Sequence, residues 1–439
     1  MANFLAFWLA LSSAAFITGS LADNMMPPKV VCYYDSRSYI RETQAKMLPS
    51  DLDPALPYCT HLIYGYAGID AATHKMVSLN TGLDLDQGHA NYRVITQLKR
   101  KFPALKILLS VGGDADTEGT EKYLTLLETP EARVAFINSA VVILKNYGFD
   151  GIDLAWEFPK VKPKKIRGSL GSFWHGFKKV FTGDSILDEK AEEHKLGFTK
   201  LVQELKNAIR PDNFLMTASV LPSVNSTHYF DTHSIMNYLD FIILDAYDYY
   251  TPERNPKQAD YPAPLYELHE RNPELNVDSI VTWWVRNAVP SYKLVLGIPT
   301  YARTWKMTSD SEGAGVPPIT VDGPAPEGPY TKQAGLLSFP EVCSKLTNPN
   351  NQKGLHTHLR KVTDPSKRFG TYAFRVADDN DEGGIWVGYE DADTTGNKAA
   401  YVKAKGLGGI AINDLSLDDF RGLCSGDKFP LLRAAKYRL

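Results

Sequence analysis

The chain of 439 residues has little net charge and lacks common metal and nucleotide motifs. Its formal net charge is −3, so the composition does not indicate nucleic acid or a membrane surface as a partner. No H-E-x-x-H spacing occurs, and we therefore expect no metal ion and no other cofactor. No G-x-G-x-x-G turn follows the first apolar run, which argues against an open nucleotide-binding sheet.

Long hydrophobic runs are also absent, except for one at the start of the chain over residues 1–22. This run is short for a membrane span, and Ser20 and Ala22 form the small-x-small pattern of a cleavage site. The pattern predicts a signal peptide over residues 1–22 and a secreted, extracellular protein without membrane insertion. An uncleaved anchor is the alternative, and the run lacks the basic side chain usual in a signal peptide.

Cysteine is scarce, with four residues in the chain. Four cysteines allow three pairings. Cys32 lies on the first apparent strand and Cys59 just before the second, so neighbouring strands would bring them close. We predict disulfides Cys32–Cys59 and Cys343–Cys424, with four buried thiols as the alternative. Asn225 begins an N-S-T sequon, which predicts glycosylation in a secreted chain.

Eight short apolar runs recur along the chain and predict buried strands, because their apolar residues are continuous and do not alternate with polar ones. They cover residues 29–34, 61–66, 106–111, 149–156, 214–220, 240–247, 293–300 and 407–413. Helical sequence separates them, which indicates parallel strands with crossover connections. Eight such strands in one chain of this length favour an α/β fold of the closed (β/α)8 TIM-barrel type.

The clearest helix signal between these strands covers residues 129–148. Thr129 is the expected N-cap, Pro130 occupies the first helical position, and Gly148 can end the helix. The face expected to pack on the core carries Val134, Ile137, Val141 and Leu144.

Two intervals are too long for simple connections. Residues 303–385 are rich in Gly, Pro and polar residues, and we expect a small α+β domain inserted between the seventh and eighth strands. The barrel would then comprise residues 23–302 and 386–439. The other interval follows Glu157 and mixes lysines with Phe173, Trp174 and Phe177. It predicts a long loop at the functional face of the barrel, either merely solvated or binding a partner.

The strand expected over 149–156 carries the most suggestive acids. Asp153, Ala155 and Glu157 alternate, so all three should face the barrel interior, with Glu157 at the mouth. A glutamate there can protonate a leaving-group oxygen if its surroundings raise its pKa. A salt-bridged surface carboxylate is the plainer interpretation of a lone glutamate, but Asp150 and Asp153 extend the pattern.

This stretch resembles the D-x-x-D-x-D-x-E signature of the family 18 glycoside hydrolases, the chitinases. Supporting similarities occur in chain order at "KVVCYY", "CTHLIYGYAG", "LLSVGG", "DFIILDAYD", "LGIPTYAR" and "KGLGGIAINDLSLDDF". The resemblance implies a TIM barrel whose cleft binds N-acetylglucosamine polymers. Here the signature consists of Asp150, Asp153 and Glu157, with Ala155 replacing the last aspartate.

The departures from the family pattern predict that the chain is not an enzyme. In the family the substrate's own acetamido group attacks the anomeric carbon, and the last aspartate stabilises the developing charge. Ala155 cannot do this, and losing such a group costs on the order of 10²–10³ in rate. Asn413 and Asp114 replace family tryptophans, and Asp245 replaces a methionine. The alternative is a weakly active chitinase that uses Glu157 as proton donor.

Other cleft positions of the family are retained and predict carbohydrate binding through stacking and hydrogen bonds. They are Tyr33, Tyr66, Glu157, Tyr247, Asp248, Tyr301 and Arg303. The alternative is that these aromatic residues persist for packing at the strand ends.

A closer resemblance, over about residues 29–439, is to the insect imaginal disc growth factors. It rests on four stretches, "FPKVKPKKIRGSLGSFWHGFKKVFTGD", "VLPSVNSTHYFD", "TDPSKRFGTYAFR" and "RGLCSGDKFPLLRAAKYRL". It implies a secreted chitinase-like protein that promotes proliferation, polarisation and motility of imaginal disc cells together with insulin-like peptides. Roles in cuticle integrity are also implied. The implied partners are a cell-surface receptor or an insulin-like peptide–receptor complex, and chitin or other N-acetylglucosamine glycans.

Overall fold

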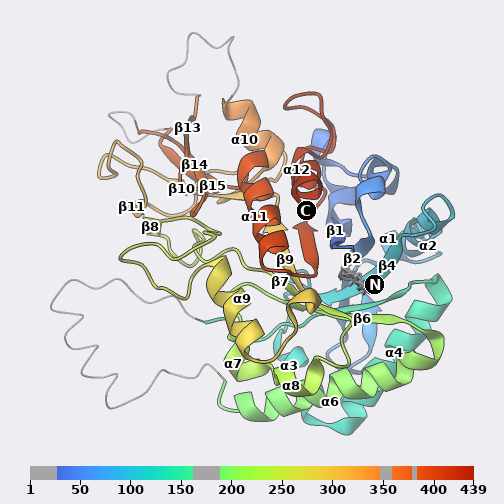
Figure 1. Cartoon of the computed structure of the whole chain (residues 1–439). Helices are drawn as coiled ribbons and strands as arrows, with labels where there is room; N and C mark the ends of the chain where they lie inside the picture. Colours follow the sequence, from blue (N-terminus) through green and yellow to red (C-terminus); the bar gives the residue numbers. More distant parts are fainter. Residues whose placement is uncertain (1–26, 162–187, 347–357, 378–382) are drawn as a thin grey trace, which may run out of the picture.

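Eight parallel strands form a closed barrel, as the apolar runs predict (Figure 1). They are β1 (Lys29–Asp35), β2 (His61–Ile69), β4 (Lys106–Gly112), β5 (Gly151–Ala155), β6 (Leu215–Val220), β7 (Phe241–Leu244), β9 (Leu294–Pro299) and β16 (Gly409–Asn413). Each pairs with the next, and β16 pairs with β1 to close the barrel. The short β3 (Met76–Ser78) runs antiparallel to β2.

This computed structural model describes residues 27–161, 188–346, 358–377 and 383–439. The expected signal peptide and most of the basic loop after Glu157 lie outside the described residues. No described helix has the length and apolar character needed to cross a membrane.

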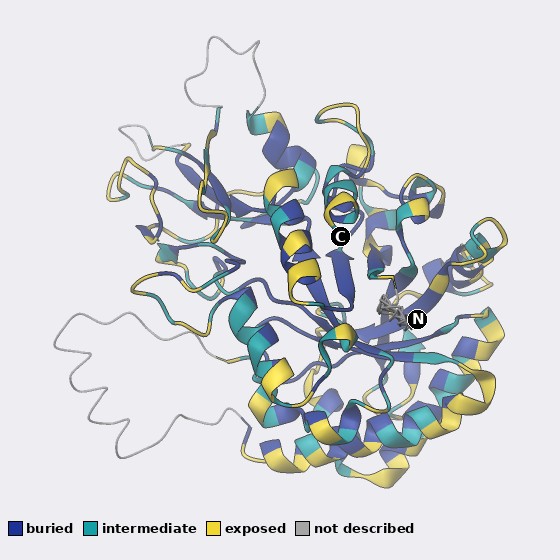
Figure 2. Ribbon diagram, in the orientation of Figure 1, coloured by how far each residue is buried: buried dark blue, intermediate teal, exposed yellow. Residues whose placement is uncertain are grey.

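Helices surround the barrel, with buried residues on their inner faces and exposed residues on their outer faces (Figure 2). The longer ones are α2 (Asn91–Gln97), α3 (Glu121–Glu128), α4 (Pro130–Tyr147), α6 (Ala191–Ile209), α9 (Val277–Arg286), α11 (Ala392–Ala404) and α12 (Pro430–Arg438). Single-turn helices are α1 (Thr81–Asp84), α7 (Ser226–Tyr229) and α8 (Thr232–Ile235). The strands are almost wholly buried, which explains why they are apolar without alternation.

Helix α4 confirms the expected caps and, except at Val134, the expected core face. The Thr129 hydroxyl accepts a hydrogen bond from the Ala132 amide, and Gly148 ends the helix at a φ of 76°. The buried face includes Phe136, and Val134 is 51% exposed. The prediction was wrong for Val134 because the bulkier Phe136 packs toward the barrel. Residues two positions apart lie on nearly opposite sides of a helix, so Val134 faces outward.

A second unit follows β9 and forms a five-stranded antiparallel sheet beside the barrel (Figure 1). In spatial order its strands are β12 (Leu336–Ser338), β10 (Tyr301–Lys306), β15 (Ile385–Tyr389), β14 (Thr371–Arg375) and β13 (Arg360–Thr363), with α10 (Phe339–Leu346). β8 (Gln258–Ala259) and β11 (Ile319–Thr320) make a small separate pair. The boundaries expected at 302/303 and 385/386 both fall inside strands of this sheet, which spans Tyr301 to Tyr389.

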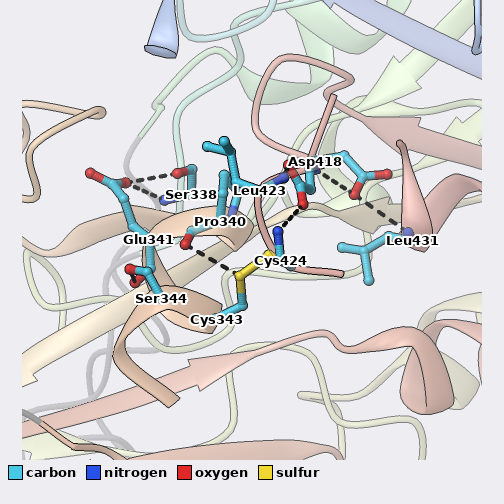
Figure 3. Close-up of a disulfide and its surroundings, with 10 residues drawn as sticks. Ser338, Pro340, Glu341, Cys343, Ser344, Asp418, Leu423, Cys424 and Leu431 are labelled. Carbon is cyan, nitrogen blue, oxygen red and sulfur yellow. Dashed lines mark hydrogen bonds between the residues drawn. A yellow bond between two sulfur atoms is a disulfide. The ribbon is translucent and has the colours of Figure 1, made fainter. Parts of the chain in front are cut away.

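Both predicted disulfides are present, and they join distant segments. Cys32 on β1 bonds to Cys59, which precedes β2. Cys343 on α10 bonds to Cys424 and ties the inserted unit to the C-terminal segment (Figure 3). The second bond closes 81 residues of sequence. Chain-entropy estimates put the stabilisation from a loop of this size at roughly 4 kcal/mol.

Candidate functional site

Asp153 lies at the centre of the barrel and is fully buried. The hydroxyls of Ser110 and Thr217 donate to its carboxylate at 2.7 and 2.6 Å, and the Ser219 hydroxyl donates at 3.0 Å. The Tyr33 hydroxyl approaches it at 3.4 Å. Burial raises the pKa of Asp153, and these hydroxyl groups oppose that rise. The carboxyl group therefore anchors four strands, β1, β4, β5 and β6.

Asp150 lies away from the mouth, at the other end of β5. Its carboxylate accepts a hydrogen bond from the Ile107 amide at 2.8 Å and pairs with the Lys99 ammonium at 3.0 Å. Asp150 thus holds β5 against β4 at the base of the barrel. It lies at the opposite end of β5 from the cleft residues described below.

Two glycines after Ser110 bring the ends of β4 and β5 together. A Cβ on Gly112 would lie 2.1 Å from the Ala155 carbonyl oxygen, and one on Gly113 would lie 2.2 Å from the Tyr66 ring. Both glycines have positive φ, 99° and 67°. Glycine is required here because any side chain would separate these strand ends.

Glu157 lies just beyond β5 at the mouth and is 8% exposed. Its carboxylate accepts a hydrogen bond from the Asp114 amide at 2.5 Å. Burial, together with the Asp114 carboxylate, raises the pKa of Glu157 to about 7, although the Asp114 amide and the Lys160 ammonium oppose the rise. At neutral pH the group therefore exists in both protonation states, as an acid–base catalyst requires.

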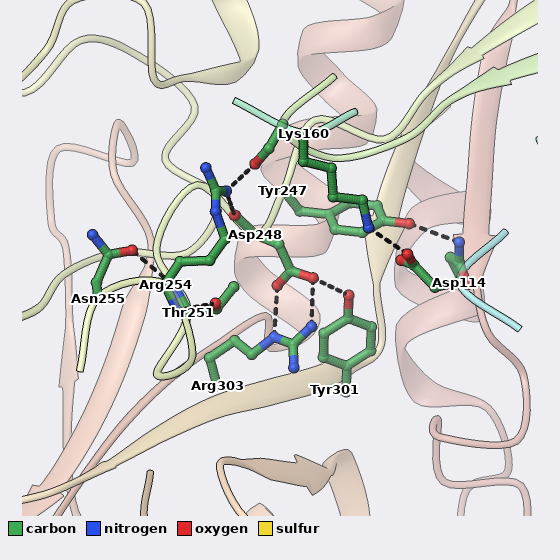
Figure 4. A network of polar contacts seen from close by, with 11 residues as sticks. Asp114, Lys160, Tyr247, Asp248, Thr251, Arg254, Asn255, Tyr301 and Arg303 are labelled. Atoms are coloured by element: carbon green, nitrogen blue, oxygen red, sulfur yellow. Dashed lines mark hydrogen bonds and ion pairs between the residues drawn. The ribbon is translucent and has the colours of Figure 1, made fainter. Parts of the chain in front are cut away.

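An ion pair between Lys160 and Asp114 lies beside Glu157 (Figure 4). The segment that carries Lys160 is fixed to the opposite rim, because the Val161 amide donates to the Ser223 carbonyl at 2.9 Å. Arg254 donates to the Val161 carbonyl at 2.7 Å and also to the Ser223 hydroxyl. The side chains of Lys160 and Asp114 remain 36% and 54% exposed, so the pair lies at the surface of the mouth.

The other side of the mouth is an ordered polar network (Figure 4). Arg303 donates two hydrogen bonds to Asp248, at 2.8 and 2.6 Å, and the Tyr301 hydroxyl donates to the same carboxylate at 2.7 Å. The Asn413 amide donates to the Tyr247 hydroxyl at 2.7 Å. Asn413, at a position where the family resemblance places a tryptophan, therefore makes a hydrogen bond and offers no stacking surface.

Asp245 adds a further acid at the end of β7. It is 4% exposed, and its Oδ1 has no hydrogen-bond partner within the described parts of the chain. Burial raises the pKa of this carboxyl group well above its ordinary value, and a hydrogen bond with Tyr247 opposes the rise. Protonation of Asp245 would give a neutral polar group where the resemblance places methionine.

The structure brings the predicted carbohydrate-binding residues to one end of the barrel. Tyr33 and Tyr66 come from β1 and β2, and the remaining residues follow β5, β7 and β9. Tyr33, Tyr66 and Tyr247 are only 2%, 8% and 3% exposed, and Tyr301 and Arg303 are partly exposed. Few aromatic faces are therefore open to a sugar in this conformation.

The sequence interpretation missed three contributors to this site. Thr217 and Ser219 hold Asp153, and Arg254 fixes the rim. The alternating small hydroxyls in "TASV" could have indicated an inward-facing polar stripe on an otherwise apolar strand. Arg254 lies in a loop and carried no comparable signal.

Two further predictions concern glycosylation at Asn225 and the expected absence of a metal ion. Asn225 caps α7, and its Oδ1 accepts hydrogen bonds from the Thr227 and His228 amides. Its glycosylation remains a prediction. The described residues contain no cluster of His, Cys, Asp and Glu side chains suited to a metal ion.

Comparison with known proteins gives a consistent result. Residues 29–418 match the family described as Glycosyl hydrolases family 18. The chain is 64% identical to chitinase-like protein EN03 of Bombyx mori, over 94% of this chain and 95% of that protein. It is 52% identical to imaginal disk growth factor 6 of Drosophila melanogaster, over 98% of both chains.

Solved structures with the same fold include a chitinase catalytic domain and a pseudo-chitinase. Catalytic domain 2 of the Ostrinia furnacalis Group II chitinase superposes with a TM-score of 0.76 at 31% identity, over 94% of this chain and 96% of that domain. Human YKL-39 is described as a pseudo-chitinase with retained chitooligosaccharide binding properties. It superposes with a TM-score of 0.74 at 28% identity, over 94% of this chain and 99% of that protein.

Proposed function

The chain belongs to the glycosyl hydrolases family 18 and, within it, to the insect chitinase-like proteins related to the imaginal disc growth factors, and from this premise we propose that it is a secreted, catalytically silent protein that binds N-acetylglucosamine glycans. The observation that carries the proposal is the methyl group of Ala155 at the end of β5. The family motif requires a carboxylate at this position, and its acid partner Glu157 is retained.

Ala155 removes the group on which the family's chemistry depends. Hydrolysis proceeds through attack by the substrate's acetamido oxygen, and a carboxylate beside it must stabilise the cation that forms. A methyl group can neither accept the acetamido N–H nor offset positive charge. Glu157 can still donate a proton, but the leaving group would depart without this assistance, at a cost on the order of 10²–10³ in rate.

Glycan binding requires that the Lys160–Asp114 side-chain pair at the mouth separates, while Arg254 keeps the backbone beside Lys160 in place. The Lys160–Asp114 pair is partly exposed, and surface pairs contribute about 0 to 1 kcal/mol. An oligosaccharide can therefore displace it at small cost and reach Tyr247, Asp248 and Tyr301. The binding ascribed to YKL-39, a pseudo-chitinase of the same fold, supports this part of the proposal.

The biological role that fits the relatives is extracellular signalling. We propose that the protein promotes proliferation, polarisation and motility of imaginal disc cells together with insulin-like peptides, through a cell-surface receptor or peptide–receptor complex, and supports cuticle integrity. The name of the Drosophila relative supports this role. The two disulfides fit an oxidising, extracellular location.

A second candidate function is weak chitin hydrolysis. The observation that favours it is the pKa of Glu157, which burial raises to about 7 and which suits a general acid at neutral pH. The two candidate functions can be distinguished because only the second requires hydrolysis, which would depend on Glu157.

The test applies purified secreted protein and its Glu157→Gln variant to disc cells in the presence of insulin. We expect equal stimulation of proliferation by both proteins, since the proposed signal does not require hydrolysis. Stimulation lost in Glu157→Gln, together with turnover of a fluorogenic chitooligosaccharide by the wild type, would favour the enzyme. No stimulation by either protein would remove the growth-factor role.

A further inference from the structure

A cavity of about 320 Å³ lies outside the barrel mouth, between the inserted unit and two helices that cover the barrel. Its lining includes Asp364, Lys367 and Arg368 from the turn between β13 and β14, Asn397 from α11, and Arg438 from α12. This volume suits a small organic ligand, and such sites occur preferentially at junctions between domains. The turn belongs to the "TDPSKRFGTYAFR" stretch, which the cleft does not use.

Three cations at this cavity lack acidic partners. Lys367, Arg368 and Arg438 are exposed, and none of them makes an ion pair with any residue that the structure describes. The Arg368 guanidinium lies 5.1 Å from the centre of the Tyr266 ring. The Arg438 side chain lies beside Gly396 on α11. The Arg368 and Arg438 side chains are therefore held near the cavity by packing and keep their charge available.

The acid on the same turn as Lys367 and Arg368 is already engaged within that turn. The Asp364 carboxylate accepts hydrogen bonds from the amides of Ser366, Arg368 and Phe369 at 2.7 to 2.8 Å. These bonds lower the pKa of Asp364, against the effect of burial, and fix the backbone that carries Lys367 and Arg368. The carboxylate thus orders the turn and has few acceptor positions left for a ligand.

The balance of charge at the cavity is positive although the chain is negative. Three exposed cationic side chains line it, Lys367, Arg368 and Arg438, against two acidic ones, Asp364 and Asp393, while a fourth, Lys398, is buried in an ion pair with Glu390. The whole chain has a formal charge of −3. Asp393, Thr394 and Asn397 belong to the first two turns of α11, whose N-terminal end adds positive potential. The cavity therefore attracts anions locally.

We propose that this cavity binds an anionic sugar unit, bearing sulfate or carboxylate, of an acidic glycan. The volume exceeds what an inorganic anion needs. Thr363 and Asn397 offer hydrogen bonds for sugar hydroxyls, and Leu265, Pro365 and Phe369 offer an apolar wall for the ring. The cations would bind the acidic group through charge-assisted hydrogen bonds.

This cavity is separate from the barrel mouth. Residues Phe369 to Thr371 lie between it and a much smaller space of about 10 Å³ next to Asp248, Tyr301 and Arg303. That smaller space holds no more than a water molecule. The proposed acidic-glycan site therefore does not depend on the N-acetylglucosamine cleft or on the function proposed for it.

The experiment titrates the purified full-length secreted protein with three tetrasaccharides at an ionic strength of about 150 mM. They are a heparin tetrasaccharide with sulfates and carboxylates, a hyaluronan tetrasaccharide with carboxylates alone, and neutral chitotetraose. We expect the heparin tetrasaccharide to bind at the cavity. Additional binding of hyaluronan would show that carboxylate suffices, and its absence would assign sulfate.

The deciding variant is the triple substitution K367Q/R368Q/R438Q, for which we expect at least a roughly tenfold loss of heparin affinity. The matched control is K75Q/K200Q/R286Q, which removes the same charge from exposed residues without ion pairs elsewhere on the described surface. We expect the control to bind within about twofold of wild type. Chitotetraose binding should be unchanged in both variants.

A third variant, Asn397→Trp, tests the cavity rather than its charge. The indole fills the space without changing net charge, so heparin binding should fall while the melting temperature stays near that of wild type. An equal loss of heparin affinity in the two triple variants would show that heparin is attracted by the overall charge of the surface, and it would overturn the proposal. Undisturbed binding in Asn397→Trp, or no binding by the wild type, would overturn it as well.

Discussion

The centre of the barrel and its mouth hold acids of the same motif in opposite surroundings. Asp153 at the centre is fully buried, and three hydroxyls donate to it within 3.0 Å. Glu157 at the mouth receives a single backbone amide, beside an exposed ion pair. Between them, Ala155 has no polar side chain. The centre keeps a complete network, whereas the mouth has lost a member of the motif.

This difference indicates that the two acids persist for different reasons. Asp153 connects four strands, so its loss would disturb the barrel whatever the protein does. Glu157 connects little, and neighbouring positions such as Asp114 and Asn413 depart from the hydrolase pattern. On the proposed function, the motif persists as a structural element at its inner end although its outer end no longer supports hydrolysis. The following variants test that distinction.

The largest expected effect is that of Asp153→Ala. Removing the carboxylate leaves the buried hydroxyls of Ser110, Thr217 and Ser219 without their acceptor. We expect the free energy of unfolding to fall by about 3 to 5 kcal/mol, measured by urea denaturation. Asp153→Asn, which retains one acceptor oxygen, should lose less. A loss below about 1 kcal/mol for Asp153→Ala would contradict the structural role of this carboxyl group.

The next effect is the pH dependence contributed by Glu157. Burial raises the pKa of Glu157 in the folded protein to about 7, from an ordinary value of 4.5, so the folded state binds more protons between these pH values. The contribution of Glu157 to the free energy of unfolding is therefore largest below pH 4.5. It falls by up to about 3 kcal/mol as the pH rises toward 7. Glu157→Gln does not titrate. The difference between the two stability curves should show this fall, and parallel curves would exclude the raised pKa.

A smaller effect is expected for Asp114→Asn. The Asp114–Lys160 pair is exposed, and asparagine tolerates the φ of 63° at this position, so unfolding should change by less than about 1 kcal/mol. The pKa of Glu157 should fall, because the Asp114 carboxylate helps to raise it. The midpoint of the pH-dependent stability change measures this shift. Destabilisation as large as that of Asp153→Ala would erase the contrast between centre and mouth.

The smallest expected effect is that of Ala155→Asp on hydrolysis. The substitution restores the motif, but Asn413 still bonds to Tyr247 and Asp245 still occupies the end of β7. We expect no turnover of a fluorogenic chitooligosaccharide above background. Rates like those of a family chitinase would show that Ala155 alone accounts for the silence and that Asn413 and Asp245 matter little.

Much of the fold could be predicted because its strands are buried on both faces. Continuous apolar runs located all eight barrel strands, and neighbouring strands suggested the Cys32–Cys59 pairing. The exposure of Val134 on α4 could not be predicted, since Phe136 and Val134 compete for the core and only tertiary packing decides between them. The inserted unit was expected, but its strand ends at Tyr301 and Tyr389 depend on pairing between segments distant in sequence.

The candidate site was predictable where residues follow strand ends. Glu157 was expected at the mouth for that reason, whereas Tyr247 and Asp248 were expected there because the family resemblance implies it, and all three lie there. The low exposure of Tyr33 and Tyr247 could not be anticipated, because it depends on how loops from different strands meet above them. The Lys160–Asp114 pair could not be anticipated either, because its two residues are 46 positions apart and meet only through the geometry of the loops.

The most direct test of catalytic silence with retained binding is one titration. Purified secreted protein is titrated with the N-acetylglucosamine tetramer, and the same samples are then separated to identify products. We predict saturable binding with the tetramer recovered intact. Accumulation of shorter oligomers with the wild type, absent with Glu157→Gln, would contradict the account and establish a working hydrolase.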